Sequence, residues 1–217
     1  MLHRVYDNLI PPHIVKEVAD LVQAENVYWQ WIKSTVGDTD LAYIRPEIAE
    51  SPQFVHVLHP RTHQGSDRLI FLINRIIQIV VEKSDIDFFH IFRSKANLLV
   101  QQRDVDPKCY HSPHCDIITK DLAECFKTKQ AVSLIYYPIN CDGTTRIFDT
   151  MVDVIDESNT TINAIKTANC VAEIEPVAGR CLLFPANLLH ASSSPRKSIR
   201  RIVFNTVFFS NTQWPPN

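Results

Sequence analysis

Apolar residues in the first part of the chain repeat with helical spacing in two places. Residues 13–24 and 66–83 both carry apolar side chains three or four positions apart, which predicts two amphipathic helices. Pro11 and Pro12 suit the start of the first helix, because proline needs no backbone hydrogen bond there. The apolar stripe of the second helix is wide enough to pack along a sheet.

From residue 86 onward the pattern changes to short apolar or alternating runs that are separated by turn residues. Such runs predict β-strands. The expected strands cover residues 86–93, 96–102, 109–116, 131–139, 145–149, 151–155, 170–175, 180–184 and 200–209, after two earlier strands at 26–33 and 54–58. Helices followed by many short strands favour an α+β, mainly β fold: a double-stranded β-helix (jelly roll, cupin-like) braced by N-terminal helices.

Length and composition indicate one globular domain. We expect residues 1–217 to form it, with 1–85 as a helical support region and 86–209 as the jelly-roll core. The formal net charge of −2 gives no basic signature for a nucleic-acid partner. No apolar run is long enough for a membrane span and no export signal is visible, so the six cysteines are expected to be reduced thiols in a cytoplasmic protein.

The residues that carry chemistry gather around His114 and Asp116. On a strand, side chains two residues apart point to the same face, so this imidazole and carboxylate can reach one point in space. His190 follows much later, after the turn and apolar strand of residues 179–185. Two histidines and one carboxylate form the facial triad of non-haem iron oxygenases.

A second metal hypothesis uses neighbouring thiols and imidazoles. The residue types suit zinc in the group Cys109, His111, His114 and Cys115. Their spacing does not give the usual pair of cysteines two to four residues apart, and Cys115 would face away from His114 on a strand. The iron triad is therefore the preferred interpretation.

Several segments together resemble the Fe(II)- and 2-oxoglutarate-dependent oxygenases, in particular the prolyl 4-hydroxylase-like branch. The matching segments are His114-Cys115-Asp116, residues 132–140, 142–148 and 176–184, His190, and residues 201–205. They span roughly residues 86–209. Two features depart from the family pattern: residues 101–104 stand where the family has a tyrosine-containing turn, and Thr144 replaces the second glycine after Gly143.

The resemblance implies a ligand set and two co-substrates. It makes Fe(II) the metal, 2-oxoglutarate and O2 the co-substrates, and ascorbate a candidate addition. Arg201 would pair with the distal carboxylate of 2-oxoglutarate, and the Tyr137 hydroxyl would bond the same group. Arg200 is the alternative to Arg201, because adjacent strand residues face opposite ways and only one can point into the barrel. The metal ligands would be His114, Asp116 and His190.

The resemblance also implies the reaction, hydroxylation of a C–H bond. A prolyl residue in a peptide or protein is the first expectation for the substrate. The alternatives are a free amino acid or small metabolite, a cupin-type enzyme without 2-oxoglutarate, and a non-catalytic metal- or ligand-binding module. The long loops 37–51 and 119–129 are expected to act as lids over the site.

Overall fold

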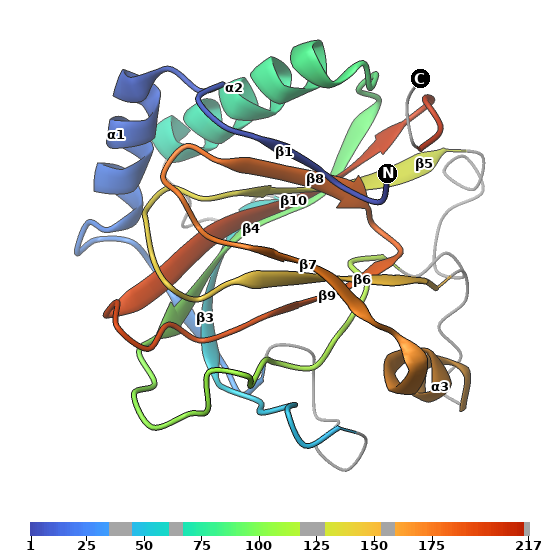
Figure 1. Ribbon diagram of the computed structural model, residues 1–217. Coiled ribbons are helices and arrows are strands. Elements are labelled where there is room, and N and C mark those ends of the chain that lie inside the picture. Colours follow the sequence, from blue (N-terminus) through green and yellow to red (C-terminus); the bar gives the residue numbers. More distant parts are fainter. Residues whose placement is uncertain (35–44, 61–66, 118–128, 153–158, 215–217) are drawn as a thin grey trace.

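The computed structural model describes residues 1–34, 45–60, 67–117, 129–152 and 159–214, and its strands form two antiparallel sheets (Figure 1). In the described residues the larger sheet has seven strands, in the spatial order β1 (Arg4–Tyr6), β8 (Cys181–Pro185), β5 (Gln130–Tyr136), β10 (Arg200–Ser210), β4 (His90–Val100), β3 (Gln53–His59) and β2 (Gln30–Ile32). The smaller sheet has the order β7 (Cys170–Ile174), β6 (Thr145–Met151) and β9 (Leu188–Ser192). This arrangement agrees with the expected mainly β jelly roll.

Two helices cover the outer face of the larger sheet. They are α1 (Pro12–Val22) and α2 (Asp67–Ser84), which confirms both predicted helices. Their buried apolar side chains pack against every second residue of β5, including Leu134 and Tyr136. In β10 the residues Ile202 and Phe204 point to the same helices. The outer face of this sheet is therefore an apolar core.

The inner face of the larger sheet packs against the smaller sheet. Ile135, Leu182 and Val203 from the larger sheet meet Ile147 and Leu188 from the smaller one in a second buried cluster. Because side chains alternate along a strand, each central strand contributes to the helix-covered core with one set of residues and to the space between the sheets with the other.

A third helix, α3 (Asn159–Thr167), covers the outside of the smaller sheet, where Ile165 packs with Phe148 and Leu189. The sequence interpretation did not predict this helix. Its segment contains three threonines and two asparagines, which have low helix propensity. Burial of Ile165 against the smaller sheet supplies stabilisation that local propensity does not.

Three predicted strands need correction. Residues 86–93 and 96–102 do not form two strands, because β4 (His90–Val100) is a single strand that joins them. Its register shifts once opposite Val207 and Phe208 of β10 and once opposite Val57 and His59 of β3. Residues 109–116 are not a strand either and make only isolated bridges, at Tyr110 and His114. Pro113 lies within that segment and has no backbone donor for a strand ladder.

Parts of other predicted features lie outside the described residues. These are most of the strand at 151–155 and large parts of the two expected lid loops, 37–51 and 119–129. Of the described helices, none combines the length and the apolar character that crossing a membrane requires.

The packing of α2 on the larger sheet generates a stability prediction. Ile76 is 1% exposed, and its replacement by alanine should lower the free energy of unfolding by about 2–5 kcal/mol because it leaves a cavity under the helix. The exposed Asn74 of the same helix is the control, and Asn74→Ala should change stability by less than about 0.5 kcal/mol. Urea unfolding, monitored by circular dichroism, measures the free energy of unfolding of both variants. An equal loss of stability in Ile76→Ala and Asn74→Ala would contradict this packing.

Candidate metal centre

The backbone brings His114 and His190 side by side although they are far apart in sequence. Each donates its backbone N–H to the carbonyl of the other, at 2.9 Å and 3.0 Å. This reciprocal pairing joins the 109–117 segment to β9, and the two imidazole centroids lie 4.4 Å apart. The backbone N–H of Asp116 also bonds the Ala186 carbonyl, at 2.9 Å, just before β9 begins. Backbone hydrogen bonds therefore fix all three predicted ligands relative to one another.

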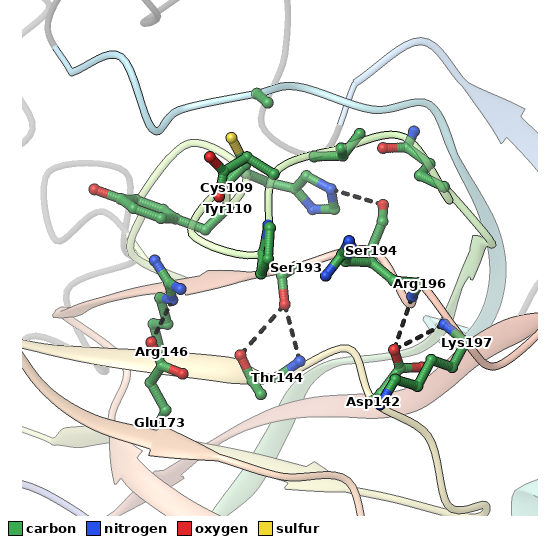
Figure 2. A pocket seen from close by; sticks show the side chains of 16 residues that line it. Cys109, Tyr110, Asp142, Thr144, Arg146, Glu173, Ser193, Ser194, Arg196 and Lys197 are labelled. Carbon is green, nitrogen blue, oxygen red and sulfur yellow. Dashed lines mark hydrogen bonds and ion pairs between the residues drawn. The ribbon is translucent and has the colours of Figure 1, made fainter.

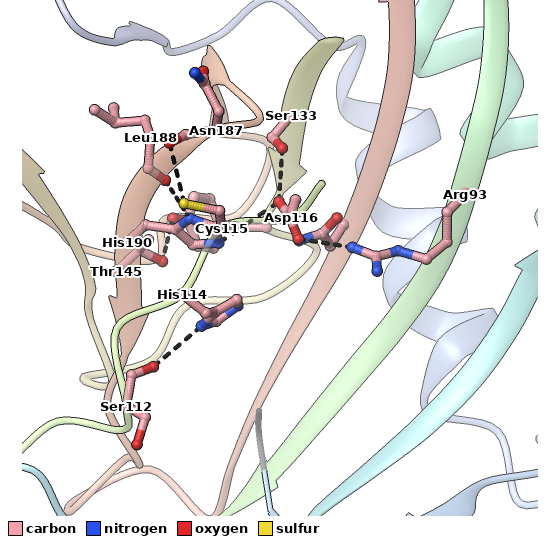
Figure 3. A network of polar contacts seen from close by, with 12 residues as sticks. Arg93, Ser112, His114, Cys115, Asp116, Ser133, Thr145, Asn187, Leu188 and His190 are labelled. Atoms are coloured by element: carbon pink, nitrogen blue, oxygen red, sulfur yellow. Dashed lines mark hydrogen bonds and ion pairs between the residues drawn. The ribbon is translucent and has the colours of Figure 1, made fainter. Parts of the chain in front are cut away.

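Both imidazoles present the same ring nitrogen to the centre. The Nδ1 atom of His114 bonds the Ser112 carbonyl at 3.1 Å, and that of His190 bonds the Leu188 carbonyl at 3.0 Å (Figure 3). A carbonyl only accepts, so each Nδ1 carries a proton and each Nε2 is the nitrogen left for a metal. Such backbone bonds typically orient histidine ligands of metals. One potential ligand atom from each of His114, Asp116 and His190 lies within 4.8 Å of the others.

Donors from three strands surround the Asp116 carboxylate (Figure 3). Ser133 of β5 donates to Oδ2 at 2.6 Å, and Arg93 of β4 donates through Nη2 to Oδ1 at 2.7 Å. The Asn205 amide of β10 bonds both oxygens, at 3.0 Å and 3.1 Å. The Nε2 atom of His190 lies 3.6 Å from Oδ2. The carboxylate is thus fully hydrogen-bonded and held in one orientation.

The electrostatics of the centre follow from this burial. Burial alone would raise the pKa of Asp116, but the neighbouring His190, the Arg93 guanidinium and the hydrogen bond from Ser133 outweigh it and hold this pKa well below its usual range. Burial lowers the pKa of His114 to about 3, and the neighbouring His190 adds to the shift. At neutral pH the centre therefore offers an ionised carboxylate and a neutral His114 imidazole, which are the states that bind a divalent cation.

Arg201 lies inside the same barrel and has no acidic partner among the described residues. It is 2% exposed, and its guanidinium donates to the Gly143 carbonyl at 2.9 Å and to the Thr145 hydroxyl at 2.7 Å. The Tyr137 hydroxyl donates to the same Thr145 oxygen at 2.8 Å. The structure thus brings Arg201 and Tyr137 together through Thr145. Burial raises the pKa of Tyr137 to about 12, so its hydroxyl stays protonated at neutral pH.

Arg200, the alternative to Arg201, points out of the barrel. Its guanidinium bonds the Gln23 side-chain oxygen through Nε at 3.1 Å and Nη2 at 2.7 Å, at the end of α1. The alternation of side chains along β10 therefore places Arg201, and not Arg200, on the face that carries Asn205.

The thiols and imidazoles of the zinc hypothesis do not converge. Cys115 Sγ bonds the Asn187 carbonyl, and the ring nitrogens of His111 bond the hydroxyls of Ser192 and Ser194 at 3.0 Å and 3.1 Å. Burial lowers the pKa of His111 to about 4, so this histidine is a neutral structural residue. Among the residues that the structure describes, the triad is the one group of three or more potential ligands within reach of a single ion.

A polar cavity of about 220 Å³ is lined in part by His111 and by Ser194, which bonds it (Figure 2). Its three acids already have partners, and the Asp106 carboxylate accepts the backbone N–H of Lys108 at 2.8 Å. Glu173 forms an ion pair with Arg146 at 2.9 Å, and the Asp142 carboxylate accepts backbone N–H groups from residues 196–198. Its lining mixes both signs of charge, so it favours no single class of ligand.

Sequence reasoning missed the polar residues that support the centre. Ser133 and Thr145 stand in apolar strands where serine and threonine carry no specific signal. Arg93 and Lys95 were overlooked because the range 86–102 was divided into two strands between them. A single strand would have shown polar side chains at alternate positions, which indicates one polar face.

No protein-family model and no curated protein sequence matches the chain. Solved structures do match its fold. The α-ketoglutarate-dependent epimerase SnoN from nogalamycin biosynthesis is 14% identical, with a TM-score of 0.62 over 97% of this chain and 78% of its own. A prolyl-4-hydroxylase from Pseudomonas putida is 14% identical, with a TM-score of 0.52 over 96% of this chain and 92% of its own.

A third match is a prolyl hydroxylase from Trichoplax adhaerens, solved with a peptide of hypoxia inducible factor. It is 13% identical, with a TM-score of 0.55 over 96% of this chain and 83% of its own. At these identities the likeness concerns the fold. This chain therefore has the double-stranded β-helix fold of the 2-oxoglutarate-dependent oxygenases.

Proposed function

We propose that this protein is an Fe(II)- and 2-oxoglutarate-dependent dioxygenase with His114, Asp116 and His190 as its metal ligands. The chemistry of the donor set supports the metal, because two imidazoles and one carboxylate suit Fe(II) and leave open coordination positions. Bound iron would supply the activation of O2 and the oxidative decarboxylation of 2-oxoglutarate to succinate and CO2.

The observation that carries the proposal is the buried guanidinium of Arg201. A buried permanent cation without an acidic partner among the described residues requires an anion to compensate it. Arg201 and Asn205 share one face of β10, four residues or roughly 13 Å apart along the strand, and Asn205 bonds Asp116. A short dicarboxylate can extend from the metal centre toward Arg201, and 2-oxoglutarate has this form.

Three residues of this protein would position the distal carboxylate of that co-substrate. The planar fork of Arg201 suits a carboxylate, and the Thr145 hydroxyl accepts bonds from Arg201 and Tyr137 so that its own proton is free to be donated. Apolar side chains such as Ile135 and Leu182 exclude water from the space between the sheets.

The proposal also concerns the class of substrate. The likeness to two prolyl hydroxylases supports a prolyl residue in a peptide or protein. The likeness to SnoN, which is an epimerase from nogalamycin biosynthesis, supports a small molecule as the second candidate. Uncoupled formation of succinate tests the shared co-substrate chemistry without knowledge of the substrate.

The triad predicts metal-dependent stability and turnover. Fe(II) or Mn(II) should raise the melting temperature of the protein under anaerobic conditions, and Fe(II) with O2 should support slow formation of succinate from 2-oxoglutarate. His190→Ala should abolish both effects because it removes one of three ligands. The exposed His13 is the control, and His13→Ala should retain both. Metal stabilisation that persists in His190→Ala would contradict this ligand set.

Replacing Arg200 and replacing Arg201 should have different effects on the 2-oxoglutarate concentration that the protein requires. Arg201→Ala should raise the concentration needed for half-maximal succinate formation about 30-fold or more, because it removes the buried partner of a carboxylate. Arg200→Ala should leave it unchanged, and Arg201→Lys, which keeps the charge, should recover part of the loss. Equal losses in Arg200→Ala and Arg201→Ala would show that the assignment along β10 is wrong.

Ser133 should act as a positioning residue for the metal. Its hydroxyl orients the Asp116 carboxylate, so Ser133→Ala should weaken the binding of Mn(II) about 10- to 100-fold in a competitive titration. Ser94 provides a matched control, because it is equally buried but bonds Thr206 instead. If Ser94→Ala weakens the binding of Mn(II) as much as Ser133→Ala does, the effect is general destabilisation.

A further inference from the structure

Basic and amide side chains form a polar row on the inner face of β4. The register places Lys95 opposite Asn205 and Arg93 opposite Val207 of β10. Arg93, Lys95 and Asn97 are two residues apart in turn, so all three face the same side, and Arg93 reaches Asp116. The row therefore flanks the metal centre on its β4 side.

The positive charge of this row exceeds the negative charge available to it. Asp116 is the acid that pairs with Arg93, and no hydrogen bond or ion pair joins Lys95 to any described residue. Burial lowers the pKa of Lys95 to about 8, with a further lowering by Arg93 and an opposing effect of Asp116. A metal bound to Asp116 would take up the charge of this carboxylate, which leaves two cations without a counterion.

Buried polar atoms in the same place also lack partners. The Nε atom of Arg93 and the Oδ1 atoms of Asn97 and Asn205 are buried and make no hydrogen bond with the described residues. The Asn205 orientation is fixed, because its Nδ2 must face the Asp116 carboxylate and its Oδ1 must therefore point elsewhere. Buried polar groups in folded proteins are normally bonded, so these atoms indicate an external ligand.

We propose that Arg93 and Lys95 bind a carboxylate of the substrate, and that the Asn97 and Asn205 carbonyl oxygens accept hydrogen bonds from an N–H group beside it. This inference rests on the proposed function and narrows its substrate class. A carboxylate satisfies an arginine and a lysine together, and only a donor satisfies the two amide oxygens. A free amino acid and an acidic residue of a peptide both carry this combination.

The row is separate from the site of the co-substrate. Arg201 lies opposite Leu99 of β4, whereas Lys95 lies four residues, or roughly 13 Å, along that strand. Arg93 also keeps 30% of its side chain exposed, so a ligand can approach it from solvent, whereas Arg201 is buried. The two cationic positions therefore serve different anions.

Calorimetric titration of the protein loaded with Mn(II) and 2-oxoglutarate under nitrogen tests the proposal, because no turnover occurs. Each common L-amino acid is compared with its own amide. The N-acetyl amides of aspartate and glutamate are compared with those of asparagine and glutamine. At least one carboxylate probe should bind about tenfold or more tightly than its amide partner. If free amino acids bind more tightly than the N-acetyl amides, the substrate is a small molecule. If the N-acetyl amides of aspartate and glutamate bind more tightly, the substrate is a peptide.

Variants of Lys95 test which residue provides this preference for a carboxylate. Lys95→Met should remove the preference for carboxylate while the amide partner binds as before, and Lys95→Arg should restore it. Lys83→Met makes the same charge change on an exposed residue of α2 and should have no effect. No carboxylate preference in a protein that binds Mn(II) and 2-oxoglutarate, or a preference that survives Lys95→Met, would overturn this inference alone. Failure to bind Mn(II) would instead overturn the proposed function.

Discussion

The buried carboxylate of Asp116 is the constraint on which the centre depends. A charge removed from water is tolerated only when hydrogen bonds and opposite charges replace its hydration. Here β4, β5 and β10 each supply a donor, through Arg93, Ser133 and Asn205. These strands are adjacent in the larger sheet, so their pairing register decides whether the carboxylate is satisfied. The sheet and the metal centre are therefore stabilised by the same contacts.

Side chains alternate along β10, so its two faces have different roles. Outward residues such as Ile202 and Phe204 hold the helices, and inward residues such as Arg201 and Asn205 face the centre. A slip of one residue would turn Arg201 and Asn205 toward the helices, and would turn Arg200 and the apolar set toward the barrel interior. The apolar contacts with α1 and α2 thus fix the register that places the chemistry, although no helix residue takes part in it.

Two cationic positions on the inner face divide the proposed ligands between them. Arg201 lies deep in the barrel with Thr145 and Tyr137, where it suits the distal carboxylate of a co-substrate. Arg93 and Lys95 lie beside Asp116, nearer to solvent, where they suit an acidic substrate. An anion at each position would compensate the cations there.

The sequence alone determined the elements whose signals are local. Helical spacing located α1 and α2, and the triad was predicted from residue types and their order. Alternation along a strand allowed only one of Arg200 and Arg201 to face inward, and Arg201 was the preferred choice. Tertiary structure decided what depends on distant partners. It joined two predicted strands into one β4, left 109–116 outside any strand, and stabilised α3 against the smaller sheet. It also made Ser133, Thr145 and Arg93 part of the centre, because a polar side chain gains its role only from the group that pairing across the sheet places beside it.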